Sequence, residues 1–310
     1  MTSASAPGKI ILFGEHAVVY GRPALAVPVE QVRAEVEVRD GARPGVRLEA
    51  PAVGLKAELK TLAQDHPLAA AIHAVASSLG VSTLPALEIR IDSTIPVASG
   101  LGSGAAVSVA LIRALSSHLG RALPDEQVSA LAFEIEKLHH GTPSGIDNTV
   151  ITYASPVCFV KGRPVQRLKV GAPFTLIIGD TGLPAPTKET VAGVRKLWNA
   201  DRAHWEGVFD EIERIVRLAQ AAIEGGDIAA LGSLMDENHF WLREMTVSSP
   251  EMDHLVAAAW AAGAEGAKVS GGGRGGNMIA LVRPDMAESV AAFMREKGAS
   301  GTIITRVLPS

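Results

Sequence analysis

The chain has 310 residues, of which 47% are hydrophobic and 20% charged, and its formal net charge is −4. This composition is typical of a globular protein with one large or two medium domains, and it excludes a broad basic surface for nucleic acid. The single cysteine, Cys158, excludes an intramolecular disulfide framework and Cys-x-x-Cys metal sites, and we interpret it as a core residue.

The N-terminal residues lack the pattern of a signal peptide, and the most apolar long stretch, residues 255–264, is about half the length of a membrane span. We therefore expect a cytoplasmic protein without membrane contact.

Hydrophobic periodicity divides the first half of the chain into short strands and longer helices. In chain order we predict a strand at residues 10–13, a strand at 32–38, a loop or weak strand at 44–54, a helix at 67–79, a strand at 87–92, helices at 105–119 and 125–139, and a strand at 151–160.

The second half changes character after a buried strand predicted at residues 174–180. Residues 188–245 have helical periodicity almost throughout, with breaks near 202–205 and 225–226 that divide them into three helices. We then predict a helix at 250–263, a strand at 278–282, a helix at 284–297 and a strand at 302–308. The turn-rich segments 161–164 and 171–173 place the domain boundary between residues 168 and 169.

A glycine-rich stretch, P-V-A-S-G-L-G-S-G-A-A at residues 96–106, lies between a predicted strand and a predicted helix. Glycines let the backbone approach an anion, and the first turn of a helix offers unpaired N–H groups and a positive dipole end. The stretch is neither a Walker A loop nor a complete dinucleotide fingerprint. It therefore indicates a phosphate loop, although a simple turn stays open as an alternative.

A second glycine cluster, S-G-G-G-R-G-G at residues 270–276, precedes another predicted strand. A small set of charged residues lies in predicted turns or at a helix edge: Lys9, Glu15, His16, Glu136 and Asp147. Glycine loops that hold phosphates, together with two carboxylates and a lysine, suit phosphoryl transfer from a nucleotide to an alcohol.

Each charged residue has a plainer alternative. Lys9 and Glu15 could be surface charges, and His16 could be a satisfied core or loop histidine. Glu136 could be a solvated carboxylate at the edge of its helix, and Asp147 a helix or turn cap. His139 and His140 have no second ligand at metal spacing, so we interpret them as structural.

Three segments resemble the sequence motifs of the GHMP kinases, with the closest match to the mevalonate kinase group of that family. They are P-G-K-I-I-L-F-G-E-H-A-V-V-Y-G at residues 7–21, the glycine stretch at 96–106 and the turn H-G-T-P-S-G-I-D-N at 140–148. Residues 180–182, 187–188 and 191–195 resemble the segment that opens the family's C-terminal domain. Motifs in this order extend from residue 7 to residue 282.

The resemblance implies an α+β protein with the two-domain GHMP kinase fold. Residues 1–168 would form an N-terminal α/β domain similar to ribosomal protein S5, and residues 169–310 a ferredoxin-like α+β domain with extra helices. It also implies transfer of the γ-phosphoryl group of ATP to the 5-hydroxyl of mevalonate with Mg²⁺, and a homodimer is expected by the same analogy.

The resemblance also assigns roles. Lys9 would orient the substrate hydroxyl, and Asp147 would be the base or the partner of Lys9. The substrate-binding set would be Glu15, His16, Ser144 and Thr187. The ATP-binding set would be Pro96, Ser99, Gly100, Leu101, Gly102, Ser103, Gly104, Ala105, Ala106, Gly272 and Gly273. The metal would be held by Glu136 and Ser103.

Two positions depart from the family pattern. The central loop usually reads G-L-G-S-S-A, and its second serine, a metal ligand, is Gly104 here. The second glycine cluster at residues 270–276 corresponds to a family motif that is usually an unbroken glycine–alanine run, and here it contains Arg274. This arginine could be solvated or could add charge beside the phosphates.

Two rival interpretations remain. One is a related enzyme: a mevalonate 3-kinase, a phosphomevalonate kinase or a decarboxylase, the last disfavoured by the complete set of Lys9, Glu15, His16 and Asp147. The other is a catalytically inactive GHMP-fold sensor, favoured only by the missing hydroxyl at Gly104.

Overall fold

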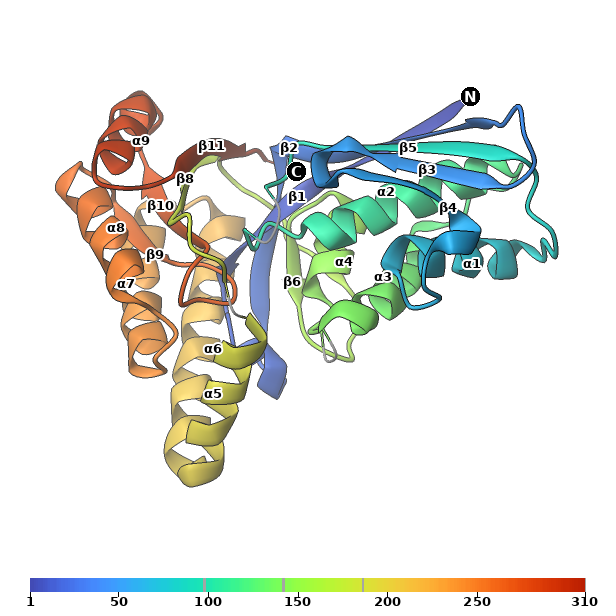
Figure 1. Ribbon diagram of the computed structural model, residues 1–310. Helices are drawn as coiled ribbons and strands as arrows, with labels where there is room; N and C mark the ends of the chain where they lie inside the picture. The colour runs from blue at the N-terminus through green and yellow to red at the C-terminus, as the bar shows by residue number, and fades with distance from the viewer. Residues whose placement is uncertain (97–98, 141–142, 186, 310) are drawn as a thin grey trace. The chain divides into compact units, whose positions relative to one another are not determined.

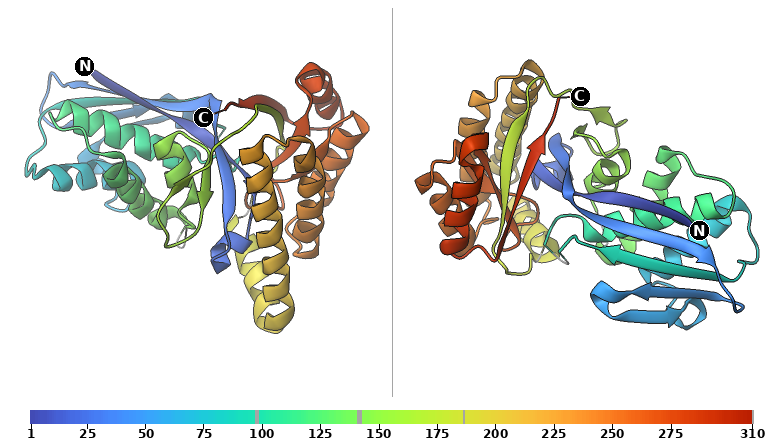
Figure 2. Two further views of the ribbon diagram at one scale, coloured as in Figure 1. Left: turned by 180° about the vertical axis from the view of Figure 1, so that it is seen from behind. Right: turned by 90° about the horizontal axis from the view of Figure 1, so that it is seen from above.

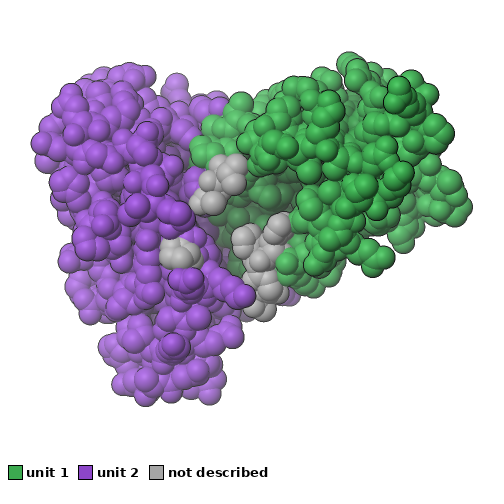
Figure 3. Space-filling view, viewed as in Figure 1, with its two compact units in different colours: residues 1–9, 32–97, 101–154 green, residues 10–31, 98–100, 155–310 purple. Residues whose placement is uncertain are grey.

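The computed structural model describes residues 1–96, 99–140, 143–185 and 187–309, without the side chains of residues 139 and 140. Its chain packs into two compact units, which Figure 3 colours separately. Unit 1 comprises residues 1–9, 32–97 and 101–154, and unit 2 comprises residues 10–31, 98–100 and 155–310. Because neither unit is a continuous stretch, a boundary between residues 168 and 169 stays a prediction.

Unit 1 is a layer of strands with helices on one face (Figure 1). Its elements are β1 (Thr2–Phe13) and β2 (Ala24–Asp40), both of which continue into unit 2, followed by β3 (Val46–Ala50), β4 (Leu55–Glu58), α1 (Pro67–Leu79), β5 (Leu87–Ser93), α2 (Ser103–His118), α3 (Asp125–His140) and α4 (Ile146–Tyr153). In β5 the apolar residues Leu87, Ile89 and Ile91 are buried and the residues between them are more exposed, as alternation predicts. Helix α2 packs against α1, α3 and α4, which explains why most of its residues are buried.

Unit 2 contains a four-stranded antiparallel sheet in the order β11-β8-β10-β9. Its elements after residue 154 are β6 (Val157–Phe159), β7 (Gln166–Arg167), β8 (Phe174–Asp180), α5 (Thr187–Ala200), α6 (Arg202–Gly225), α7 (Ala229–Glu244), α8 (Pro250–Ala261), β9 (Gly266–Val269), β10 (Asn277–Val282), α9 (Ala287–Glu296) and β11 (Gly301–Val307). Helices α8 and α9 cover one face of the sheet (Figures 1 and 2), where Leu255 and Val256 join a buried cluster with Val290 and Met294.

The mixed α+β class is confirmed, and most predicted elements occur within a few residues of their expected positions. One prediction was wrong: residues 151–153 belong to helix α4, and only residues 157–159 of the expected strand are extended. The apolar run contains several β-branched residues, which favour strands. Packing of α4 against α2 and α3 outweighs that local preference.

Strands β1 and β2 are longer than predicted, and β9 was not predicted. Among the described residues, no helix is both long and apolar enough to cross a membrane.

Candidate active site

Lys9 and Asp147 form an ion pair in unit 1, with 3.0 Å between Nζ and Oδ1. Lys9 lies in β1 and is only 4% exposed, and its backbone N–H donates to the carbonyl of Leu101 at 3.0 Å. Asp147 is in the first turn of α4, directly after Gly145 and Ile146, where the helix dipole favours a carboxylate. Its side chain keeps 27% exposure, so a buried cation is paired with a carboxylate that solvent and ligands can reach.

Gly102 brings the glycine loop against the lysine. Its φ of +76° is left-handed, and a Cβ built there would lie 2.8 Å from Ile151 Cδ1 and 3.2 Å from Lys9 Cγ. Any larger residue would push into the Lys9 side chain, so glycine is required here for both backbone conformation and close approach.

Gly102 is also the N-cap of α2, so Ser103, Gly104, Ala105 and Ala106 form the first turn of this helix. Ser103 is partly exposed and Gly104 is exposed, with no atom within 4 Å of a built Cβ, whereas the two alanines are buried. Ala106 N–H donates to the Gly102 carbonyl, which leaves the earlier amides of this turn without intrahelical partners. This is the anion-binding geometry that the sequence indicated.

Glu136 in α3 is a buried carboxylate near the ion pair, with 6% exposure. Its pKa is raised to about 8, first by burial and then by the negative charge of Asp147, while Lys9 opposes the shift. A buried carboxylate beside another carboxylate gains from a bound cation. Among the described residues no three His, Cys, Asp or Glu side chains cluster as a metal site, so a cation here would need further ligands such as a hydroxyl, water or phosphate.

Ser144 organises the start of α4: its Oγ accepts a hydrogen bond from the Ile146 N–H at 3.3 Å. It is partly exposed. Residues 141 and 142 of the same motif lie outside the described residues, as do residues 97 and 98 of the glycine stretch. Pro96, the first residue of that stretch, is exposed.

His16 belongs to unit 2, where its backbone has a φ of +61°, which is unusual for a residue with a side chain. Its Nε2 lies 3.1 Å from the carbonyl oxygen of Gly272 and therefore donates the hydrogen bond. Burial lowers the pKa of His16 to about 4, and Arg274 lowers it further, whereas the Gly272 carbonyl opposes the shift. His16 is thus neutral at pH 7 with its proton on Nε2.

Glu15 pairs with Lys268 of β9, and both side chains are fully buried. Sequence reasoning did not predict Lys268 as a site residue. The signal that could have found it is a lone lysine in the strand sequence G-A-K-V directly before the second glycine cluster.

The second glycine cluster packs closely on its neighbours within unit 2. A Cβ on Gly272 would lie 2.2 Å from Oγ1 of Thr187, and one on Gly273 would lie 2.2 Å from the Val247 carbonyl. Thr187 is the exposed first residue of α5. The Arg274 guanidinium donates two hydrogen bonds to Thr246, one to its carbonyl at 2.8 Å and one to its Oγ1 at 2.9 Å. This residue therefore stabilises the loop through contacts with the protein itself.

Ser99 and Gly100 are the described residues of the first glycine loop that belong to unit 2, and Asn277 at the start of β10 holds Ser99. The buried Asn277 side chain donates to the Ser99 carbonyl at 2.6 Å. Asn277 is a second residue that sequence reasoning missed, because nothing in its immediate sequence indicates a partner 178 positions away.

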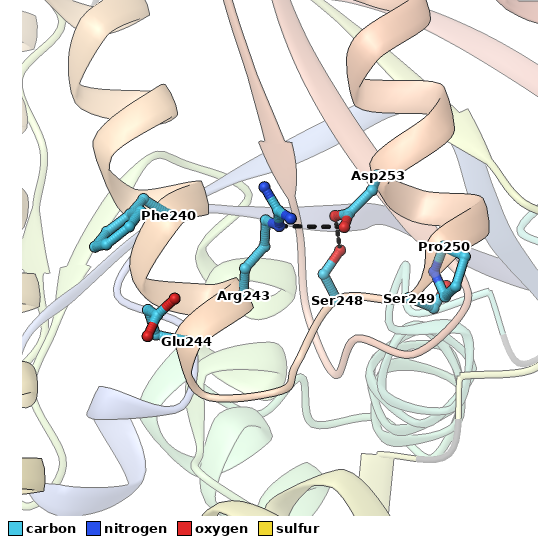
Figure 4. A pocket seen from close by; sticks show the side chains of 7 residues that line it. All are labelled: Phe240, Arg243, Glu244, Ser248, Ser249, Pro250 and Asp253. Carbon is cyan, nitrogen blue, oxygen red and sulfur yellow. Dashed lines mark hydrogen bonds and ion pairs between the residues drawn. The ribbon is translucent and has the colours of Figure 1, made fainter.

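A pocket of about 340 Å³ lies elsewhere in unit 2, where α7 leads into α8 (Figure 4). Asp253 is its central polar group, since Ser248 Oγ donates to it at 2.5 Å and Arg243 Nε lies 3.1 Å from it. None of the predicted site residues lines this pocket.

Comparisons with known proteins identify the family of the chain. The family description "GHMP kinases N terminal domain" matches residues 66–155, and "GHMP kinases C terminal" matches residues 218–300. A mevalonate kinase of Pyrococcus horikoshii is 34% identical over 324 aligned positions, covering 98% of this chain and 95% of that relative.

Two solved structures have nearly the same fold. The mevalonate kinase of L. major, solved in complex with R-mevalonate, superposes with a TM-score of 0.86 at 29% identity, covering 100% of this chain and 97% of that chain. A phosphomevalonate kinase of Streptococcus pneumoniae superposes with a TM-score of 0.85 but at 17% identity, covering 99% of this chain and 100% of that chain, so it shows the fold alone. With both family descriptions matched and a full-length relative at 34% identity, the chain belongs to the GHMP kinases, in the group of the mevalonate kinases.

Proposed function

We propose that this protein transfers the γ-phosphoryl group of ATP to the 5-hydroxyl of mevalonate. The observation that carries the chemistry is the Lys9–Asp147 ion pair, in which a buried ammonium packed under the glycine loop meets a partly exposed carboxylate. The choice of substrate is supported by the relatives, which are named mevalonate kinases, one of them solved with R-mevalonate.

In the proposed reaction the 5-hydroxyl oxygen attacks the γ-phosphorus while the bond from this phosphorus to the bridging oxygen breaks, and ADP leaves. Asp147 accepts the hydroxyl proton, and Lys9 orients Asp147 and the attacking oxygen. The α2 N-terminus, from Ser103 to Ala106, and Gly102 hold the phosphates. Pro96, Ser99, Gly100, Leu101, Gly272 and Gly273 are proposed to complete the ATP site, and His16, Ser144 and Thr187 the substrate side.

The residues present also suit Mg²⁺. The ligands we propose are the buried carboxylate of Glu136, whose pKa is raised to about 8 without a cation, and the hydroxyl of the partly exposed Ser103. When bound, the ion would neutralise phosphate charge as the transfer proceeds. Gly104 supplies no side-chain ligand, so we expect a water molecule in place of the usual serine hydroxyl.

The test is ADP release by the purified protein with ATP, Mg²⁺ and a panel of alcohols: mevalonate, phosphomevalonate, homoserine and galactose. We expect turnover with mevalonate, and ³¹P and ¹³C NMR of the product should place the phosphate on the 5-oxygen. Phosphate on the 3-oxygen, or turnover only with phosphomevalonate, would replace the proposal with a related kinase. No Mg²⁺-dependent turnover with any alcohol would favour the inactive sensor. A cytoplasmic location and a homodimer stay predictions.

A further inference from the structure

Lys268 and Glu15 form a fully buried ion pair in which neither side chain has any exposed surface. The Lys268 ammonium also donates to the carbonyl of Val269 at 2.7 Å. Burial lowers the pKa of Lys268, whereas the Glu15 carboxylate raises it. A buried ion pair is seldom the most stable solution for a protein interior, since apolar residues of similar volume often serve as well. Its presence beside a predicted substrate ligand therefore suggests a role in function.

The pair is one of several contacts that join residues 11–16 to residues 268–272 within unit 2. Ser270 Oγ donates to the Ile11 carbonyl at 2.7 Å, and His16 Nε2 donates to the Gly272 carbonyl at 3.1 Å. Lys268 and Glu15 form the contact between these two. The chain from 11 to 16 is thus held at its start, near its end and at its last residue.

His16 needs such support because its positive φ of +61° is strained for a residue with a Cβ. Glu15 is its immediate neighbour in sequence. An anchored Glu15 side chain restricts the peptide that leads into His16, and so also the direction of the imidazole.

His239 is a titratable group close enough to Lys268 to interact with it electrostatically. The neighbouring His239 has its pKa lowered to about 4 by burial above all, while Asp253 raises it and Lys268 and Arg243 lower it. His239 is therefore neutral at pH 7 and places no second positive charge next to the ion pair.

We propose that Lys268 is a positioning residue: through its buried ion pair with Glu15, it holds the turn that presents His16 to the substrate. Glu15 then acts on the substrate only through His16, in place of the direct contact implied by the family resemblance. The effect on mevalonate rests on the proposed function, whereas the effect on His16 does not.

Three variants test the proposal. Lys268→Met leaves Glu15 buried without its cation, and Glu15→Gln with Lys268→Met removes both charges together. Val269→Ala is the matched control, because it trims a fully buried side chain at the next position of β9 and leaves the ion pair in place.

In thermal unfolding we expect the double variant to regain most of the stability that Lys268→Met loses, since no unpaired charge stays buried. In steady-state kinetics, however, the KM of the double variant for mevalonate should stay about tenfold above the wild-type value, with kcat and the KM for ATP nearly unchanged. Val269→Ala should lose stability and keep its KM. A double variant whose KM for mevalonate recovers together with its stability would overturn the proposal.

A second measurement on the substrate-free protein uses NMR of ¹⁵N-labelled imidazoles, with the His16 signals assigned from a His16→Gln variant. In the wild type, His16 should hold its proton on Nε2 and stay neutral down to about pH 5. In the double variant its pKa should rise toward 6.5 and the preference for the Nε2 proton should weaken. An unchanged His16 would overturn the proposal, whether or not the protein phosphorylates mevalonate. If wild-type protein does not consume mevalonate but His16 responds as expected, the proposed function fails and the positioning role stands.

Discussion

At the scale of single residues, the main feature of the site is a lysine that is almost completely buried yet paired with a carboxylate that is not. Burying a charge is unfavourable unless a partner compensates it, and Asp147 does so for Lys9 at 3.0 Å. Because Asp147 keeps 27% exposure, it can also meet an alcohol. The pair therefore combines a fixed cation with an accessible proton acceptor.

We predict that Asp147→Asn removes most turnover while leaving ATP binding largely intact. The amide keeps the shape of the side chain but cannot accept the hydroxyl proton, so kcat should fall by about 10²–10⁴-fold. Steady-state ADP release and calorimetric titration with an ATP analogue measure the two effects. Asp125→Asn is a matched control, because Asp125 also lies in the first turn of a helix and pairs with Arg113 at 2.7 Å. Near-normal kcat in Asp147→Asn would exclude Asp147 as the base.

A second residue-scale prediction concerns acid stability. His239 is 3% exposed and its pKa is lowered from 6.5 to about 4, chiefly by burial, with Lys268 and Arg243 adding to the shift and Asp253 opposing it. Between these pH values the unfolded chain binds a proton that the folded chain does not, so the free energy of unfolding falls as the pH drops through this window. A tenfold difference in proton affinity is worth about 1.4 kcal/mol, so His239 should account for about 2 kcal/mol of lost stability by pH 5.

Urea unfolding at pH 7.5 and pH 5.0 checks this expectation. The wild type should lose more stability on acidification than His239→Gln, in which His16 still contributes its own pH dependence. Equal losses in the two proteins would show that His239 is not held neutral in the fold.

At the scale of elements, the junction between the glycine loop and α2 combines two requirements. Gly102 must adopt a left-handed φ to cap α2, and it must also leave room for Lys9 and Ile151. Gly104, two residues later, has open space around it. A side chain is therefore tolerated at position 104 but not at position 102, although the two glycines look alike in the sequence.

We predict that Gly102→Ala destabilises the protein by about 1–3 kcal/mol, because the new methyl group strains the backbone and displaces Lys9. The same displacement should lower kcat at least about tenfold, since a small error in the position of a catalytic group greatly reduces the reaction rate. Thermal unfolding and steady-state kinetics measure both effects.

The matched control is Gly104→Ser, which should fold with wild-type stability or slightly better, since serine is the better helix former. It should also lower the Mg²⁺ concentration needed for half-maximal activity, because it restores a hydroxyl at this position. Equal effects of the two substitutions would contradict the difference in packing between them.

At the scale of the whole molecule, the segment 10–31 belongs to unit 2 although it lies near the N-terminus. Tyr20 stacks on Phe209 with 4.3 Å between ring centroids, and Arg22 pairs with Asp210 of the same helix at 2.6 Å. Lys268 likewise depends on Glu15. The C-terminal half therefore lacks part of its own core and charge balance when the N-terminal segment is missing.

We predict that a fragment of residues 169–310 does not fold cooperatively by itself. It would bury Lys268 without its counter-ion and leave Phe209 without Tyr20. Near-ultraviolet circular dichroism and urea unfolding of the fragment, with the full chain as control, measure this. A single sharp unfolding transition of the isolated fragment would instead support independent domains divided at residue 168.

Much of the fold and part of the site could be predicted because the relevant signals are local. Periodicity predicted most helices and strands, since a buried face recurs every 3.6 or 2 residues whatever it packs against. The glycine stretch before α2 indicated an anion site because the free amides of a helix N-terminus are a property of the helix itself. The family resemblance placed Lys9 with Asp147, which spacing alone could not.

Tertiary structure decided which groups lie opposite one another. The partnership of Lys268 with Glu15 joins positions 253 residues apart, and nothing in either local sequence specifies it. The raised pKa of Glu136 depends on how deeply α3 packs, whereas periodicity placed this residue only at the edge of an apolar stripe. The helical state of residues 151–153 depends on contacts with α2 and α3 that override β-branched preference. Local sequence thus determined the chemistry that each segment can offer, and long-range packing determined the partners and the electrostatic environment, because burial and Coulomb interactions depend on distance in space.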